Sequence, residues 1–205
     1  MNLFRQMMEK PWLEERGDVV SLHGGRMFPM PQAKLGLRVF LVVVMVVFSL
    51  MVAAYTERMV FSDWHSVPIP WLLWLNTGVL ILSSVAMHWA LVSARWGRTE
   101  GVSLGMAAGG VCAFAFLVGQ LLAWRDLTAA GHYATLDPAN AFFYLLTALH
   151  GIHLIGGLVA WGKTAVRIRR GEDAVQVRLS VELCAVYWHF LLLIWLVLFA
   201  LLLVT

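Results

Sequence analysis

Five unbroken apolar blocks dominate the sequence of this 205-residue chain. They cover residues 35–55, 69–92, 101–124, 139–162 and 181–204, and each is bounded by charged residues, Pro or Gly. About 20 helical residues cross the hydrocarbon core of a bilayer, so each block is long enough to span a membrane. Only 13% of the residues are charged and 60% are hydrophobic, a balance that is rare in soluble domains. The sequence therefore predicts an integral membrane protein.

The spans are predicted to be helices. None of the five blocks alternates polar and apolar residues with period two, as the strands of a membrane β-barrel do. In lipid, every backbone N–H and C=O group must find its partner inside the protein, and a helix satisfies these groups within its own segment. We therefore expect an all-α polytopic protein in which residues 35–205 form a five-helix membrane domain.

The distribution of Lys and Arg predicts how the chain crosses the membrane. Thirteen of the 15 cations lie in the N-terminal segment up to Arg38, in the second-to-third connection or in the fourth-to-fifth connection. The positive-inside rule then places the N-terminus in the cytoplasm and Thr205 outside. Residues 1–34 are interpreted as a cytoplasmic lead, because they carry charges of both signs and no apolar core of the kind a cleaved signal needs.

Histidines inside the apolar blocks are the first candidates for function, because ionisable groups are costly in lipid. His150 and His153 lie three residues apart on one side of the predicted fourth helix, so they cannot both bind one haem iron from opposite faces. Depth along the helices permits a haem between His153 and His189. Equally, neutral histidines can donate hydrogen bonds across a glycine-rich helix seam, with Glu182 as an acceptor.

Tryptophans gather near the ends of the spans, where they are expected to anchor the protein at the membrane surface. Arg95 and Arg98 follow the second span, and we expect these two cations and the tryptophans to contact lipid head groups. Cys112 and Cys184 lie in apolar blocks without ligand-type spacing and are interpreted as small buried residues. No motif for a metal, a nucleotide or a nucleic acid is found in the sequence. The tryptophans in question are Trp71, Trp74, Trp89, Trp96, Trp124 and Trp161.

Four segments, in order and with consistent spacing, resemble subunit III of the haem-copper terminal oxidases in its short five-helix bacterial form. They are PWLLWLNTGVLILSS (70–84), GQLLAW (119–124), FFYLLTALHGIHLIGG (142–157) and VYWHFLLLIWLVLF (186–199). The residues that match the polar positions of the family are Asn76, Thr77, Gln120, His150, His153, Glu182 and His189.

This resemblance implies an accessory subunit of cytochrome c oxidase with no catalytic residue, metal or cofactor of its own. Haem and copper would then belong to partner subunits. The chain would pack directly against subunit I, in a complex with subunit II and a small subunit IV-like helix protein, in the bacterial inner membrane. It would also bind phospholipid in a cleft between helix groups, which we expect between the first two and the last three spans.

Two departures from the family pattern affect the expected role. The family usually carries a Ser-Glu inside the helix equivalent to the first span, whereas residues 35–55 contain no acid. The family ending His-Phe-x-Asp has Leu192 at the acidic position. Proton uptake through those carboxylates is therefore not expected here. Two other interpretations stay open: a haem-b membrane anchor that exchanges electrons with quinone, and a subunit III relative associated with nitric oxide reductase.

Overall fold

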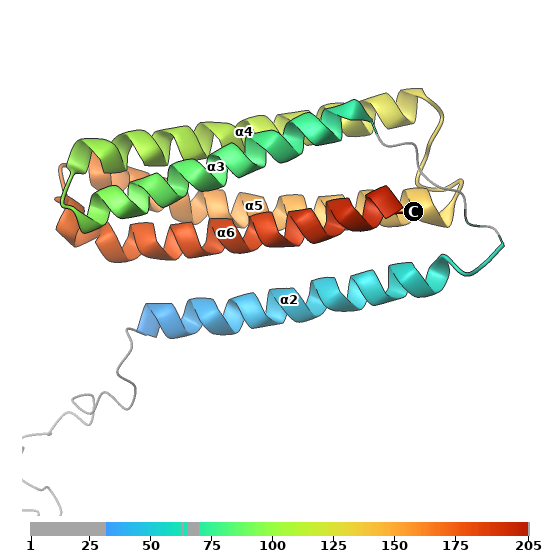
Figure 1. The fold of residues 1–205 in the computed structure, drawn as a ribbon, viewed down its shortest axis with the longest axis horizontal. Helices are drawn as coiled ribbons and strands as arrows, with labels where there is room; N and C mark the ends of the chain where they lie inside the picture. Colours follow the sequence, from blue (N-terminus) through green and yellow to red (C-terminus); the bar gives the residue numbers. More distant parts are fainter. Residues whose placement is uncertain (1–31, 63, 65–69, 205) are drawn as a thin grey trace, which may run out of the picture. The chain divides into compact units, whose positions relative to one another are not determined.

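The computed structural model describes residues 32–62, 64 and 70–204, and most of the predicted lead at 1–34 lies outside this part. Five helices account for nearly all of it: α2 (Gln32–Arg58), α3 (Trp71–Arg95), α4 (Thr99–Ala129), α5 (Pro138–Arg169) and α6 (Ala174–Val204) (Figure 1). All five contain a segment long and apolar enough to cross a membrane. The predicted all-α, five-span fold is confirmed.

Most of the helices are longer than the apolar blocks that predict them. α6 begins at Ala174 rather than at residue 181, and α5 continues to Arg169 rather than ending at 162. The backbone hydrogen bonds of a helix do not require apolar side chains, so a helix can continue beyond the hydrocarbon into charged sequence. Gly97 and Gly171 adopt φ angles of 68° and 83° in the turns that follow α3 and α5, which glycine permits without strain.

Four of the helices form a closed bundle. α3 packs against α4 and α6, and α5 packs against the same two helices. Within the compact unit formed by residues 36–205, α2 contacts α5 mainly through long aromatic side chains. Phe48 of α2 lies 5.5 Å from the ring of His153, and Tyr55 lies 5.6 Å from Phe142, both distances being between ring centroids.

Glycines allow α3 and α4 to approach closely. Gly101, Gly105 and Gly109 recur every four residues on one face of α4. A Cβ atom added at Gly105 would lie 2.8 Å from the backbone nitrogen of Ala90 on α3. Such small residues let helix backbones meet in lipid, where the hydrophobic effect between helices is weak.

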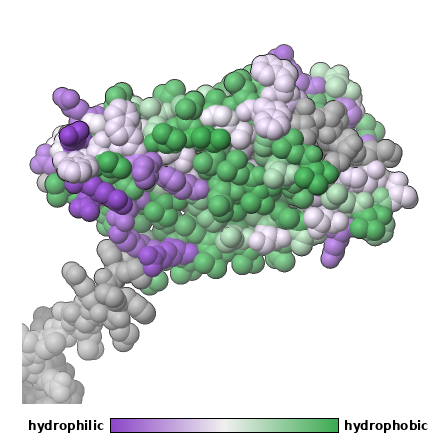
Figure 2. Space-filling model, viewed as in Figure 1, coloured by the Kyte–Doolittle hydropathy of each residue, from purple (hydrophilic) through white to green (hydrophobic). Residues whose placement is uncertain are grey.

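Apolar side chains cover much of the surface. Exposed Val, Leu, Ile, Met and Phe residues lie along every helix, and hydrophilic residues gather towards the ends (Figure 2). A surface of this kind is far more apolar than that of a soluble monomer and suits a lipid environment.

Candidate functional site

His150 lies at the centre of the four-helix bundle. Its side chain is fully buried, with ring centroids 5.7 Å from Phe116 of α4 and 5.1 Å from Trp195 of α6. Neither ring nitrogen has a hydrogen-bond partner within the part of the chain that the structure describes. Two aromatic rings from α4 and α6 therefore flank this histidine.

His153 faces a different neighbour, although only three residues separate it from His150. Its ring lies beside Phe40 and Phe48 of α2, and its Nδ1 hydrogen-bonds with the backbone oxygen of Leu149 at 2.7 Å. Three helical residues turn the side chain by about 60° net, which is enough to direct it out of the bundle towards α2.

His189 lies on the α3 side of α6. Its Nδ1 hydrogen-bonds with the backbone oxygen of Ala185, one turn earlier, and its ring centroid is 5.6 Å from that of His88. His153 and His189 therefore face different helices, and the pair that depth alone allowed for a haem is not brought together. Within the described residues, no group of three or more His, Cys, Asp or Glu side chains converges as a metal site.

The expected hydrogen bonds between helices come from other side chains than the histidines. The Nε1–H group of Trp188 donates to the Ser83 hydroxyl at 2.9 Å, and that hydroxyl donates to the backbone oxygen of Gly109 at 2.7 Å. This relay joins α6, α3 and α4. The Nε1–H group of Trp195 likewise donates to the Thr77 hydroxyl at 2.9 Å. Among the described residues, the ring hydrogen bonds of His153 and His189 go to carbonyls of their own helices and His150 has none, so the predicted histidine bonds across helices are not seen there.

The predicted tryptophan anchors fall into two groups. Trp71, Trp74, Trp89 and Trp96 are exposed near the ends of α3, as an interfacial position requires. Trp124 and Trp161 are instead partly buried, and their indole N–H groups donate to the Thr147 hydroxyl and to the backbone oxygen of Met106. These two residues connect α4 to α5.

The other family-matched polar residues also lie within the bundle. Asn76 and Gln120 are buried, and the Asn76 side chain lies against Gly119 of α4. The nitrogen atoms of both amides have no hydrogen-bond partner within the described residues. Glu182 is half-buried on α6. The structure thus brings Asn76, Thr77, Gln120 and His150 into the interior, and leaves His153 and His189 on two outer sides of it.

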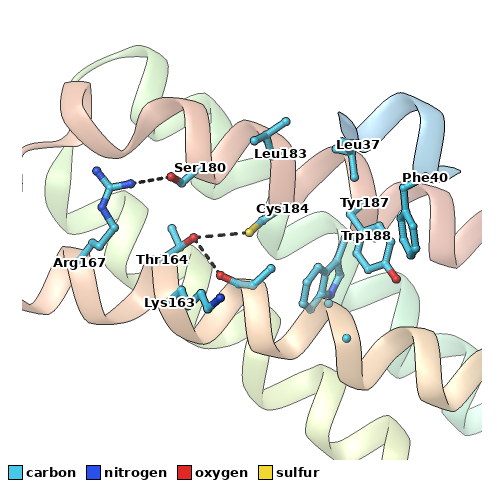
Figure 3. A pocket seen from close by; sticks show the side chains of 13 residues that line it. Leu37, Phe40, Lys163, Thr164, Arg167, Ser180, Leu183, Cys184, Tyr187 and Trp188 are labelled. Atoms are coloured by element: carbon cyan, nitrogen blue, oxygen red, sulfur yellow. Dashed lines mark hydrogen bonds between the residues drawn. The ribbon is translucent and has the colours of Figure 1, made fainter. Parts of the chain in front are cut away.

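A groove of about 580 Å³ opens between α2, α5 and α6 (Figure 3). It does not follow the expected division between the first two and last three spans, because α3 packs directly on α4 and α6. The groove is apolar along most of its length. Its lining residues are Leu37, Phe40, Gly156, Gly157, Ala160, Lys163, Thr164, Arg167, Ser180, Leu183, Cys184, Tyr187 and Trp188.

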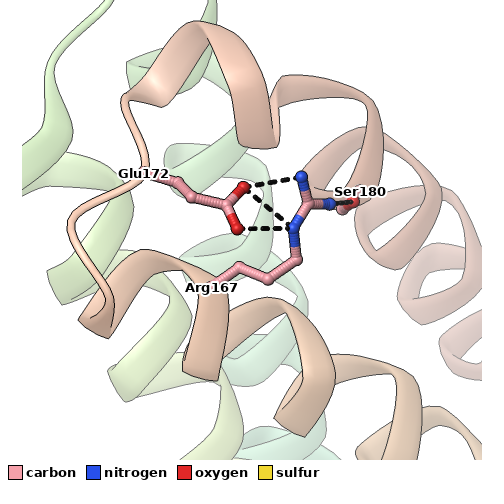
Figure 4. A network of polar contacts seen from close by, with 3 residues as sticks. All are labelled: Arg167, Glu172 and Ser180. Carbon is pink, nitrogen blue, oxygen red and sulfur yellow. Dashed lines mark hydrogen bonds and ion pairs between the residues drawn. The ribbon is translucent and has the colours of Figure 1, made fainter.

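One end of this groove is polar. The Arg167 guanidinium contacts both carboxylate oxygens of Glu172, the closest approach being 2.6 Å, and donates to the Ser180 hydroxyl at 2.8 Å (Figure 4). Glu172 therefore offsets much of the charge of Arg167. Lys163 also lines the groove, and no hydrogen bond or ion pair is described for its ammonium group in the part of the chain that the structure covers.

Sequence reasoning missed this groove. The cations of the fourth-to-fifth connection are visible in the sequence, but Lys163, Ser180 and Tyr187 come together only through the packing of α5 on α6. The one available signal is the run of small residues Gly156, Gly157 and Ala160, which leaves room beside α5.

Five helices long and apolar enough to cross a membrane, with hydrogen-bonded polar side chains between them, define the chain as a polytopic α-helical membrane protein. The sequence profile of the family "Cytochrome c oxidase subunit III" matches residues 17–204, so the chain belongs to that family. The resemblance seen in the four sequence segments is confirmed.

Individual relatives agree with this assignment. The chain is 28% identical over 123 residues to the probable cytochrome c oxidase subunit 3 of Mycobacterium tuberculosis, covering 60% of this chain and 61% of that protein. It is 32% identical over 129 residues to cytochrome c oxidase subunit 3 of Thermostichus vulcanus, covering 62% and 63% respectively. The protein of the same name from Synechocystis is 30% identical over 128 residues, covering 62% and 54%. The matched segments thus span less than two thirds of the length of these relatives.

Proposed function

We propose that this chain is the accessory subunit III of a proton-pumping haem-copper cytochrome c oxidase in a bacterial cytoplasmic membrane. The observation that carries the proposal is the family match over residues 17–204. In this role the chain packs against catalytic subunit I, beside subunit II and a small subunit IV-like helix protein. Haem and copper are held by the partner subunits, and the chain supports sustained turnover during aerobic electron transport.

The groove between α2, α5 and α6 supports a lipid-holding role. Its volume of about 580 Å³ and its apolar walls suit an acyl chain, while Lys163 and the Arg167–Ser180 pair stand at its polar end. A phospholipid that places its phosphate near Lys163 would extend its acyl chain past Gly156 and Tyr187. Lipid held there would fill the space that separates α2 from the bundle.

Co-purification tests the oxidase assignment. The full-length chain, tagged and expressed in its native host, is expected to bring down subunit I together with its haem and copper, and with oxygen-reducing activity. A reduced-minus-oxidised spectrum of the isolated chain is expected to show no haem signal. A haem b spectrum from the isolated chain would favour the quinone-linked anchor, and recovery with a nitric oxide reductase would favour the third interpretation.

Substitutions in the groove test the lipid proposal. A Cβ atom added at Gly156 meets no atom within 4 Å, so Gly156→Leu can fill the groove without displacing a helix. This variant is expected to lose bound phospholipid and to inactivate sooner during turnover, with an unchanged initial rate. Gly162→Leu is the matched control, because Gly162 is equally open but lines no part of this groove. Equal lipid content in the two variants would contradict the proposal.

A further inference from the structure

Two adjoining hollows lie at the turn between α3 and α4, away from the groove described above. The smaller has a volume of about 150 Å³ and the larger about 490 Å³, and both are lined by Trp89, Ser93 and Arg98. The turn lies at the left end of the bundle in Figure 1. The remaining lining residues are Val92 and Trp96 in the smaller hollow, and Thr99, Glu100, Gly101 and Leu104 in the larger.

Two opposite charges face the larger hollow without a partner of their own. Arg98 and Glu100 both line it and are both exposed. Among the described residues, no ion pair or side-chain hydrogen bond engages either group. Side chains two residues apart do not face each other at the start of a helix, so the two charges are poorly placed to neutralise one another. The hollow therefore offers one cation and one anion to a ligand.

The same hollow also offers neutral hydrogen-bond donors. Ser93 is only 4% exposed and lines both hollows, and none of the described hydrogen bonds uses its hydroxyl. α4 begins here with Arg98 at its N-cap, and no side chain caps its first N–H groups. Uncapped N–H groups and the positive end of the helix dipole together favour a phosphate.

The surroundings point to an amphipathic ligand. Trp89 and Trp96 are 50% and 75% exposed, and tryptophans in such positions mark the level of lipid head groups. Leu104, 58% exposed, continues from the hollow along the apolar surface of α4. A ligand that follows this path has a charged end at the turn and an apolar remainder in the membrane.

We propose that the larger hollow binds the head group of phosphatidylethanolamine. The phosphate contacts Arg98, the Ser93 hydroxyl and the start of α4, and the ammonium group donates to the Glu100 carboxylate. Glu100 disfavours an anionic glycerol head group, and the quaternary amine of choline has no N–H to donate. The site differs from the groove between α2, α5 and α6 and does not depend on lipid bound there.

Lipid binding to the purified full-length chain tests this proposal. Native mass spectrometry of delipidated protein would measure the binding of phosphatidylethanolamine, phosphatidylcholine and phosphatidylglycerol with identical acyl chains. The wild type is expected to bind phosphatidylethanolamine most tightly. Arg98→Gln is expected to weaken that binding about tenfold, since the bond between a guanidinium and a phosphate is charge-assisted. Arg125→Gln is the matched control, because Arg125 lies near the other end of α4 and lines neither hollow.

A second variant separates the amine contact from the phosphate contact. Glu100→Gln is expected to abolish the preference for phosphatidylethanolamine over phosphatidylglycerol. Lys163→Gln, which alters only the other groove, is expected to leave that preference intact. Equal binding of all three lipids by the wild type would overturn the proposal, as would equal losses in Arg98→Gln and Arg125→Gln.

Discussion

Indole N–H groups donate four of the hydrogen bonds described between helices, and imidazole rings take part in none of those described. Trp188 and Trp195 of α6 reach hydroxyls on α3, and Trp161 of α5 reaches a backbone oxygen on α4. A tryptophan is large enough to cross a helix interface and has a single donor that must be satisfied when buried. The side chains of His153 and His189 point back along their own helices, where the carbonyl four residues earlier is in reach.

Trp188→Phe tests the relay at the residue scale. The substitution keeps an aromatic ring at a fully packed position but removes the donor to the Ser83 hydroxyl. Hydrogen bonds between helices in lipid contribute about 0.6 kcal/mol on average and about 1.7 kcal/mol at most. We expect a loss of that size plus a smaller loss of packing, measured as the unfolding free energy of the full chain in detergent or bicelles. Trp89→Phe, at an exposed position, should leave stability unchanged.

His150→Leu tests the opposite case to Trp188, a buried polar side chain for which no hydrogen-bond partner is described. Leucine has a similar volume, and the substitution breaks no hydrogen bond that the structure describes. Replacing an unsatisfied polar group with an apolar one of similar shape is close to neutral or stabilising. We therefore expect an unchanged or higher midpoint of thermal unfolding. A destabilisation of about 1–3 kcal/mol would instead reveal a partner for His150 in the assembled protein.

At the scale of elements, the distance between α3 and α4 is set by glycine. Gly101, Gly105 and Gly109 face α3, whereas a Cβ atom at Gly78 of α3 would meet nothing within 4 Å. Residue type alone does not distinguish a glycine packed against another helix from one that faces open space. They differ in the repeat: the first three follow one helix face at four-residue spacing, which is the pattern of a packed seam.

Gly105→Ala should therefore destabilise the bundle. The added methyl group would lie 2.8 Å from the backbone nitrogen of Ala90 and 2.9 Å from the backbone oxygen of Ala86, and neither atom can move without shifting α3. Overpacking of this kind costs about 1–3 kcal/mol. Gly78→Ala is the control, and we expect it to stabilise α3 by about 0.5–1 kcal/mol through helix propensity. Equal effects of the two substitutions on the unfolding free energy would show that the α3–α4 seam is loosely packed.

The elements themselves could be predicted from hydropathy alone, because a helix that crosses lipid must be apolar over its whole length. The ends were less predictable: the start of α6 at Ala174 lies in charged sequence where hydropathy gives no signal. Side-chain partners were the least predictable. Whether the His153 ring meets α6 or α2 depends on how these two helices pack on α5. A rotation of about 60° around the axis of α5 is enough to change the neighbour.

At the scale of the molecule, positive charge is concentrated at one end of the bundle. The turn after α3 carries Arg95 and Arg98, and the turn after α5 carries Arg169 and Arg170; both turns lie at the same end in Figure 1. The opposite connections hold a single cation each, Arg58 and Arg125. Successive antiparallel helices place alternate turns on opposite sides of a membrane. The arginine-rich turns therefore all lie on one side of the bilayer.

This bias makes the orientation testable. A phosphatase that is active only outside the cytoplasm, fused after Thr205, is expected to be active, because the C-terminus of α6 lies opposite the arginine-rich turns. The same enzyme inserted between Arg170 and Gly171 is expected to be inactive, and that turn tolerates an insertion because both residues are exposed. Replacing Arg169 and Arg170 with Gln should lower the fraction of molecules inserted in this orientation but not reverse it, since most of the other cations remain. Activity of the reporter at 170–171 in the unaltered chain would show that the arginine-rich turns face outward.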